Sequence, residues 1–359
     1  MSKKLVFIVL IFFVIVGFNS CGDDEASAVS SDVKTLNKSR LSLHKNNRVV
    51  SYNIGDRYAA FLASQGSGGI IEELTSDLYA HFNDDFDFIT VIMNEKEKPE
   101  NVSFFGRYAN IQNDIQNIGI RNFDNSARYG SEKLQGILLL TALSYLRGGP
   151  SLHEIAHNWA NFLIKDTEWL PESSFMVGPH WGFTGGNVNG QLGGFDQRTL
   201  SDQVTTHDWF VRSFSPNASG GNLARYNEME LYLMGFISLE EVASFDMFTG
   251  LSNVVQDNVQ GVGTIIGFDA ANRTTFTPEL ILERYGRRTP EPANAQKDFK
   301  MIVVVVTGVP LTAEQWEVVD TDAEWFGRSE ADGSHVNNFW EATGGRATME
   351  LGKLDVSLK

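Results

Sequence analysis

The sequence contains almost no cysteine, and Cys21 is the only one among 359 residues. A disulfide within one chain needs two thiols and a cysteine-based zinc site needs several, so both are excluded. The chain is also poor in long apolar runs. The unbroken run from Leu5 to Val16 is shorter than the about 20 residues that a membrane-spanning helix needs.

Signatures of other enzyme classes are missing as well. The sequence has no Gly-x-Ser-x-Gly elbow and no phosphate-binding loop. The string "GVGTIIG" at 261–267 does not have dinucleotide-binding spacing, and we interpret it as a turn beside a strand. Internal repeats and proline-rich linkers are absent too, which favours one large domain.

Basic residues are scarce relative to acidic ones. The formal net charge is −16, from 29 Lys and Arg against 45 Asp and Glu. Nucleic acid and anionic lipid headgroups would repel such a chain, so we expect no nucleic-acid partner and expect peptides, glycans or metals instead. An acidic surface also keeps exported proteins soluble, which accounts for most of the charge.

The N-terminal segment has the composition of an export signal. Lys3 and Lys4 precede the apolar run, and "GFNSC" ends at Cys21. This segment resembles a bacterial lipoprotein signal, which implies cleavage before Cys21 and lipidation of it. No thiol would then remain, which would exclude a catalytic cysteine. We therefore predict a signal peptide over 1–20, a flexible tether over 21–48 and one domain over 49–359, whose part from about 300 is integral to it.

Hydrophobic periodicity predicts an α+β domain. Apolar residues recur every four positions from Ile70 to Phe82, which predicts a helix. A buried strand is predicted over 86–93, a neighbouring strand over 101–112, another buried strand over 301–306 and a closing strand near 348–351. A second helix is predicted over 223–234, after a glycine-rich loop over 178–200.

The stretch "SLHEIAHNWANFLI" at 151–164 carries the most specific signal. Its apolar positions follow helical spacing, and Ser151 is the predicted N-cap. On a helix, side chains four apart share a face, so His153 and His157 can converge on one ion. Glu154 would remain free as the general base for a zinc-bound water. Asn158 and Asn161 would extend the polar face, and Asn161 is either a support for the ligands or exposed.

This motif resembles the zincin metallopeptidases. The resemblance implies zinc as cofactor, His153 and His157 as ligands, and Glu154 as catalytic base. It also implies a small mixed sheet packed on the active-site helix, with a second half of mainly helices and loops. Position 160 is Ala and position 163 is Leu, where the metzincin branch has Gly and a third His. Over 85–350 the chain is similar to a poorly characterised group of exported bacterial zincin-like proteins.

The third ligand therefore lies elsewhere in the sequence. His180 stands at the mouth of the glycine-rich loop, and its imidazole suits zinc. Glu230 lies on the second predicted helix among apolar residues, where a carboxylate is costly unless it is paired or ligated. We rank His180 first and Glu230 second, with Glu228 and His207 as remote candidates. Asp320, Asp322 and Glu324 could meet calcium, but a solvated edge is the favoured interpretation.

Two functions fit these features. The first is a zinc-dependent endopeptidase, a monomer held by lipidated Cys21 at the outer membrane or cell surface, cleaving peptide or protein substrates. The second is an inactive zincin-like lipoprotein that binds protein or glycan through aromatic residues such as Trp181, Phe183 and Trp209. An open coordination position favours the first function, and four protein ligands favour the second.

Overall fold

Runs of β-branched and aromatic residues form the centre of the main sheet. The computed structural model describes residues 33–37, 39–67, 69–168, 179–202, 207–212, 214–215, 221–259 and 263–359. Strands β4 (Phe88–Met93) and β16 (Asp298–Thr307) pair in parallel at the middle of the sheet. Their alternate side chains enter two separate cores, with Val303 and Val305 in one and Val304 and Val306 in the other.

The main sheet is mixed and has eight strands in the order β1-β2-β3-β16-β4-β8-β5, with β17 also paired to β16. Its remaining strands are β1 (Val33–Thr35), β2 (Leu41–His44), β3 (Val49–Asn53), β5 (Gly106–Asn110), β8 (Gly136–Leu140) and β17 (Thr348–Leu351). Strand β5 runs antiparallel to β8 and forms one edge. The expected α+β class is confirmed, although the sheet is larger than the small one we expected, and β8 separates β4 from β5.

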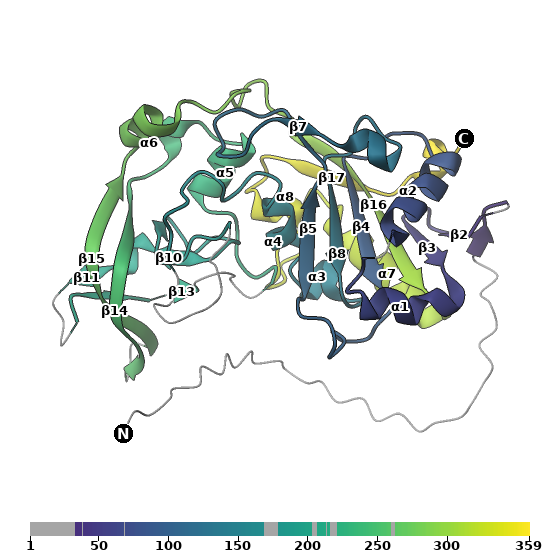
Figure 1. Ribbon diagram of the computed structural model, residues 1–359, viewed down its shortest axis with the longest axis horizontal. Helices are drawn as coiled ribbons and strands as arrows, with labels where there is room; N and C mark the ends of the chain where they lie inside the picture. The colour runs from purple at the N-terminus through teal and green to yellow at the C-terminus, as the bar shows by residue number, and fades with distance from the viewer. Residues whose placement is uncertain are drawn as a thin grey trace.

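Helices pack on both faces of this sheet (Figure 1). Helix α2 contributes Leu74 and Leu78 to one core, whereas α4 contributes Leu152 and Ile155 to the other. Helix α2 begins at Ile70, as the four-residue periodicity predicted. The helices are α1 (Tyr58–Ala63), α2 (Ile70–His81), α3 (Tyr145–Gly148), α4 (Ser151–Ala156), α5 (Glu228–Met234), α6 (Pro278–Tyr285), α7 (Ala313–Phe326) and α8 (Phe339–Ala342).

The expectation of a mainly helical and loop second half is wrong. Strands β14 (Phe245–Val259) and β15 (Gly263–Phe276) form a long antiparallel hairpin at the end of the molecule opposite β2 (Figure 1). A separate aromatic core, including Phe183, Phe248 and Phe268, packs against this hairpin. The other strands are β6 (Gln112–Asn113), β7 (Phe123–Asp124), β9 (Gly185–Gly186), β10 (Gly194–Asp196), β11 (Ser201–Asp202), β12 (Trp209–Val211) and β13 (Phe214–Ser215).

Part of the predicted tether belongs to the fold. Strands β1 and β2 fall within 21–48, and β2 pairs antiparallel with β3. Leu41 and Leu43 are buried, which explains why this polar segment is ordered. Cys21 and the predicted signal lie outside the described residues. Among the helices of the described part of the chain, none is long and apolar enough to cross a membrane.

The acidic residues of α7 do not converge on a common point. Asp320 accepts hydrogen bonds from Asn46 at 2.6 Å and Arg48 at 2.8 Å, and lies 3.1 Å from His44. Glu324 pairs with Arg328. Asp322 is buried, and burial raises its pKa to about 7 although the Arg147 charge opposes the shift. These contacts therefore give no support to a calcium site. The favoured interpretation, that these carboxylates are exposed to solvent, is wrong for Asp320 and Asp322, because both are buried.

Asp322→Asn should stabilise the protein at pH 8 but not at pH 4. Because the pKa of Asp322 rises from its ordinary 3.8 to about 7 on folding, folding binds a proton between these values. Stability is therefore lost as pH rises through this range, and an uncharged asparagine avoids the loss. Each kcal/mol of recovered stability raises the melting temperature of a large domain by about 2–4 °C, so we expect an increase of at least that size at pH 8. Asp355→Asn, at an exposed position, is the control, and an equal gain at both pH values would contradict the prediction.

Candidate metal centre

Helix α4 begins directly after Pro150, and a side chain distant in sequence caps its first turn. The Asn222 side chain accepts from the Leu152 backbone N–H at 3.1 Å and donates to the Leu146 carbonyl at 3.0 Å. The predicted N-cap is one residue off, because Ser151 is already helical and its hydroxyl donates to the Leu146 carbonyl at 2.6 Å. These contacts fix the start of the helix that carries His153.

Helix α4 ends at Ala156, well short of the predicted 164. After it, the backbone N–H groups of His157 and Asn158 bond to carbonyls three residues earlier, so the turn tightens. Asn110 of strand β5 donates to the His157 carbonyl at 2.9 Å and occupies an acceptor that a longer helix would use. Asn158 turns away from the histidines and accepts from Tyr108 at 2.8 Å.

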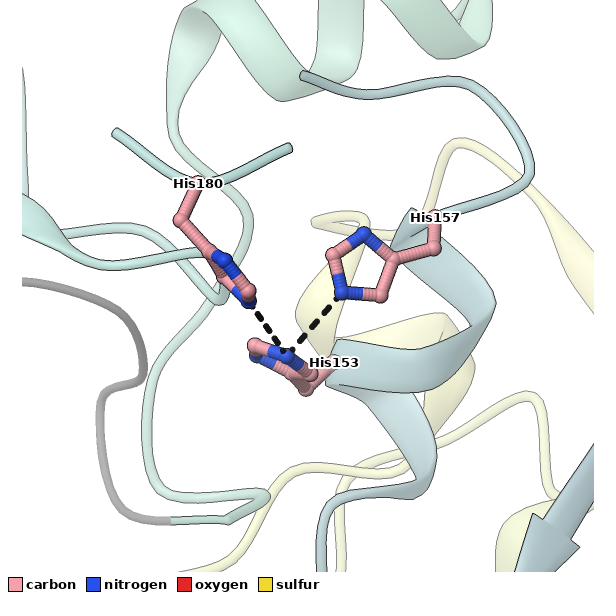
Figure 2. Close-up of side chains that lie close together, drawn as sticks. All are labelled: His153, His157 and His180. Carbon is pink, nitrogen blue, oxygen red and sulfur yellow. Dashed lines mark hydrogen bonds between the residues drawn. The ribbon is translucent and has the colours of Figure 1, made fainter. Parts of the chain in front are cut away.

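Three histidines meet beside this helix. The Nε2 atom of His153 lies 3.1 Å from Nε2 of His157 and 3.2 Å from Nε2 of His180. Figure 2 shows the three rings turned toward one another, His153 and His157 from the α4 segment and His180 from a separate loop. One ligand atom from each lies within 4.8 Å of the others. In tetrahedral zinc sites, neighbouring nitrogen ligands are about 3.3 Å apart.

Backbone carbonyls determine which ring nitrogens are protonated. His153 Nδ1 donates to the Gln191 carbonyl at 2.8 Å, and His157 Nδ1 donates to the Ala160 carbonyl at 3.2 Å. A neutral imidazole has one proton, so both Nε2 atoms present lone pairs. The two Nε2 atoms are 3.1 Å apart, and their lone pairs repel each other unless a cation lies between them. The arrangement therefore fits a metal ion.

Burial keeps these imidazoles neutral, as metal ligands must be. His153 is 8% exposed, and burial together with the His180 charge lowers its pKa to about 3. Burial and both neighbouring histidines hold the pKa of His157 well below its ordinary value. No fourth His, Cys, Asp or Glu joins the cluster within the part of the chain that the structure describes.

The loop that carries His180 folds back onto the chain that follows α4. The His180 carbonyl accepts from Thr167 at 3.1 Å and from Asn161 at 3.5 Å. The Asn161 backbone N–H also donates to the Pro179 carbonyl at 3.0 Å. Asn161 is buried, so of the two interpretations offered for it, exposure is wrong. Its hydrogen bonds hold the segment that carries His180.

Glu154 lies under the edge strand β5. A Cβ atom added to Gly106 would lie 2.7 Å from Glu154 Oε1, so the glycine permits this close approach. The side chain is 5% exposed, and burial raises its pKa to about 8 while Arg107 opposes the shift. A carboxyl group with a pKa near neutrality can both accept and release protons at physiological pH.

Glu230, the second-ranked ligand, is outside the three-histidine group. Its carboxylate is fully buried and accepts four hydrogen bonds from neighbouring N–H groups. The structure thus brings together His153, His157 and His180. The remote candidates are engaged elsewhere, since Glu228 accepts from Ala243 at 2.8 Å and His207 lies 3.8 Å from Asp269.

Sequence reasoning missed three groups that support this site. Asn222 and Asn110 contact the motif through tertiary hydrogen bonds, which the hydrophobic periodicity of the sequence does not predict. Gln191 supports His153 through its backbone carbonyl, for which no side-chain signal exists. The only part of this that the sequence indicated is that Asn110 lies on a strand, since it falls within the strand predicted over 101–112.

A scan against protein-family models and searches of curated proteins and solved structures found no match. A function can therefore be inferred only from the site itself. That site is a partly buried group of three histidines that could bind a metal ion.

Removal of His180 should release the metal. We expect His180→Ala to weaken zinc binding by far more than 100-fold, since outer-shell partners account for about 10- to 100-fold. In the parent, zinc at 100 times its dissociation constant should stabilise the fold by about 2.7 kcal/mol. Calorimetric titration and thermal unfolding with and without zinc measure both effects. His207→Ala is the control, and a His180→Ala protein that binds zinc like the parent would remove His180 from the ligand set.

Proposed function

We propose that this protein is a zinc-dependent peptide-bond hydrolase of the zincin type. The observation that carries the proposal is the convergence of three histidine nitrogens. Glu154 follows His153 in the chain, and its side chain packs under the edge strand of the mixed sheet. Three protein ligands, with no fourth among the described residues, are typical of catalytic zinc sites. A bound zinc ion supplies the positive charge that polarises a substrate carbonyl and lowers the pKa of water.

Glu154 is the general base in this proposal. Its carboxylate takes a proton from the attacking water as the water oxygen bonds to the amide carbon. The same group then delivers the proton to the departing amine nitrogen as the carbon–nitrogen bond breaks. Glu154 must be ionised to begin this cycle. Burial opposes the ionised form and raises the pKa to about 8, while the positive charge of Arg107 favours ionisation.

Strand β5 supports a peptide as the substrate. It is the last strand of the sheet order, and it passes along the motif, with Gly106 against Glu154 and Asn110 bonded to the His157 carbonyl. An extended peptide can add to such an edge through its backbone. The peptide would then run beside the base and the histidines.

Glu154→Gln should keep the metal and lose the activity. Glutamine preserves the volume of the side chain but cannot accept the proton, so we expect unchanged zinc content and a loss of about 10²- to 10⁴-fold in cleavage rate. The assay compares parent and variant on a mixed proteome, with and without chelator. Loss of zinc by the variant, or cleavage at the parental rate, would show that Glu154 is not the base.

A parent that binds zinc but cleaves nothing would instead support the alternative, a zincin-like protein that binds protein or glycan. The open edge at β5 and the three-ligand group favour the hydrolase.

We further propose that the protein is anchored by lipid at Cys21, outside the cytoplasm, on the basis of the sequence from Lys3 to Cys21. Cys21→Ala should abolish incorporation of labelled fatty acid and release the protein from the membrane fraction. Unchanged partitioning of the variant into that fraction would contradict the anchor.

A further inference from the structure

Glu230 has more hydrogen-bond partners than its place in a helix requires. Its Oε1 accepts from Trp181 Nε1 at 3.0 Å and the Leu192 N–H at 2.8 Å, while its Oε2 accepts from the Gln191 N–H at 3.1 Å and the Asn227 N–H at 2.9 Å. Only the Asn227 contact belongs to the capping box of α5. The other three donors all lie on the segment 181–192.

A second helix of this chain shows what capping alone looks like. Helix α8 has the same Asn-x-x-Glu capping box, in which Glu341 accepts from the Asn338 N–H at 3.0 Å. Glu341 is buried as well, but this is the one side-chain hydrogen bond found for it within the described residues. The three additional bonds of Glu230 therefore serve something other than the helix end.

The segment 181–192 connects Glu230 to two of the three histidines. One peptide unit joins the Gln191 carbonyl to the Leu192 N–H. Its carbonyl accepts from His153 Nδ1 at 2.8 Å, and its N–H donates to Glu230 at 2.8 Å. Hydrogen bonds in such a chain polarise one another, so a negative carboxylate strengthens the carbonyl as an acceptor. His153 then holds its proton on Nδ1 and keeps the Nε2 lone pair for a metal.

The same carboxylate holds the residue next to His180. Trp181 donates its ring N–H to Glu230 and its backbone N–H to the Leu192 carbonyl at 3.0 Å. Gly190 permits this packing, because a Cβ atom there would lie 2.4 Å from Glu230 Oε2. The buried carboxylate of Glu230 thus contacts both ends of the segment 181–192. This segment begins next to His180, and near its end lies the Gln191 carbonyl that accepts from His153.

We propose that Glu230 is a positioning residue for the metal centre. It holds His180 through Trp181 and sets the proton position and basicity of His153 through the Gln191–Leu192 peptide unit. This inference depends on the metal-binding part of the proposed function but not on peptide cleavage.

Glu230→Gln is the sharpest test. Each carboxylate oxygen accepts two N–H donors, so the amide NH₂ of glutamine must face two donors at whichever oxygen it replaces. We expect zinc affinity to fall by about 10- to 100-fold. The visible spectrum of the cobalt-substituted variant should also shift, because the ligand geometry changes. Both are measured on the full protein at a temperature where parent and variant are folded.

Two controls separate positioning from stability. Glu341→Gln makes the same change in the other capping box, where one remaining oxygen suffices for the single donor. Asn227→Ala removes the side-chain cap of α5, which costs about 1 kcal/mol, but leaves the loop contacts of Glu230 in place. Zinc affinity in both should stay within about threefold of the parent, whereas outer-shell loss is larger.

Two outcomes would overturn the proposal. Parental zinc affinity and an unchanged cobalt spectrum in Glu230→Gln would overturn it, as would an equal loss of affinity in Asn227→Ala. If Glu230→Gln does not fold, Gly190→Ala replaces it, because the added methyl group displaces the carboxylate and should weaken zinc binding to a similar extent. A parent that binds zinc without cleaving peptides would contradict the hydrolase and leave this inference standing.

Discussion

The site depends on one electrostatic constraint, which is that two imidazole lone pairs face each other 3.1 Å apart. Two backbone carbonyls create this situation by binding the Nδ1 protons of His153 and His157. Without a cation the arrangement is repulsive, so the surrounding fold must hold it in place. The holding groups come from the edge strand, from the loop after His180 and from α5. In the second half of the chain, the segment 181–192 and Glu230 of α5 contribute to this support.

The main sheet supplies the rigid side of that support. Its parallel centre is buried on both faces, and α4 packs on one of them while strand β5 closes the edge above. Asn110 binds the His157 carbonyl, and Gly106 lies against Glu154. The same strand therefore contacts the end of the motif helix. Among the described strands it is the last of the sheet order, and it lies next to Glu154. A longer α4 would have lost the Asn110 contact, so the early end of the helix is part of how the site is built.

Local patterns predicted the parts of this protein that local physics determines. The helix from Ile70 and the strands near Phe88 and Val303 have clear periodicity and were predicted correctly. The spacing of the motif predicted His153 and His157. The motif did not indicate the third member, and His180 was ranked ahead of Glu230 because its imidazole suits zinc. The length of α4 was not predictable, because the tertiary hydrogen bond from Asn110 competes with helical propensity there. Of the β14–β15 hairpin, only a turn beside a strand at 261–267 was predicted. Its length was missed, since its polar and apolar residues follow no simple alternation over its full length.

Glu230 illustrates the limit of such reasoning most clearly. A carboxylate on an apolar helix stripe is costly, and the sequence correctly indicated that something must compensate. Compensation by a metal ion and compensation by four N–H groups are equally compatible with that argument. Three of those donors are backbone amides or an indole from a loop about 40 residues earlier, and amides have no sequence signature. The buried carboxylate of Glu230 thus indicates that polar groups lie nearby. Whether those groups are a metal ion or N–H donors depends on which loop folds against the carboxylate.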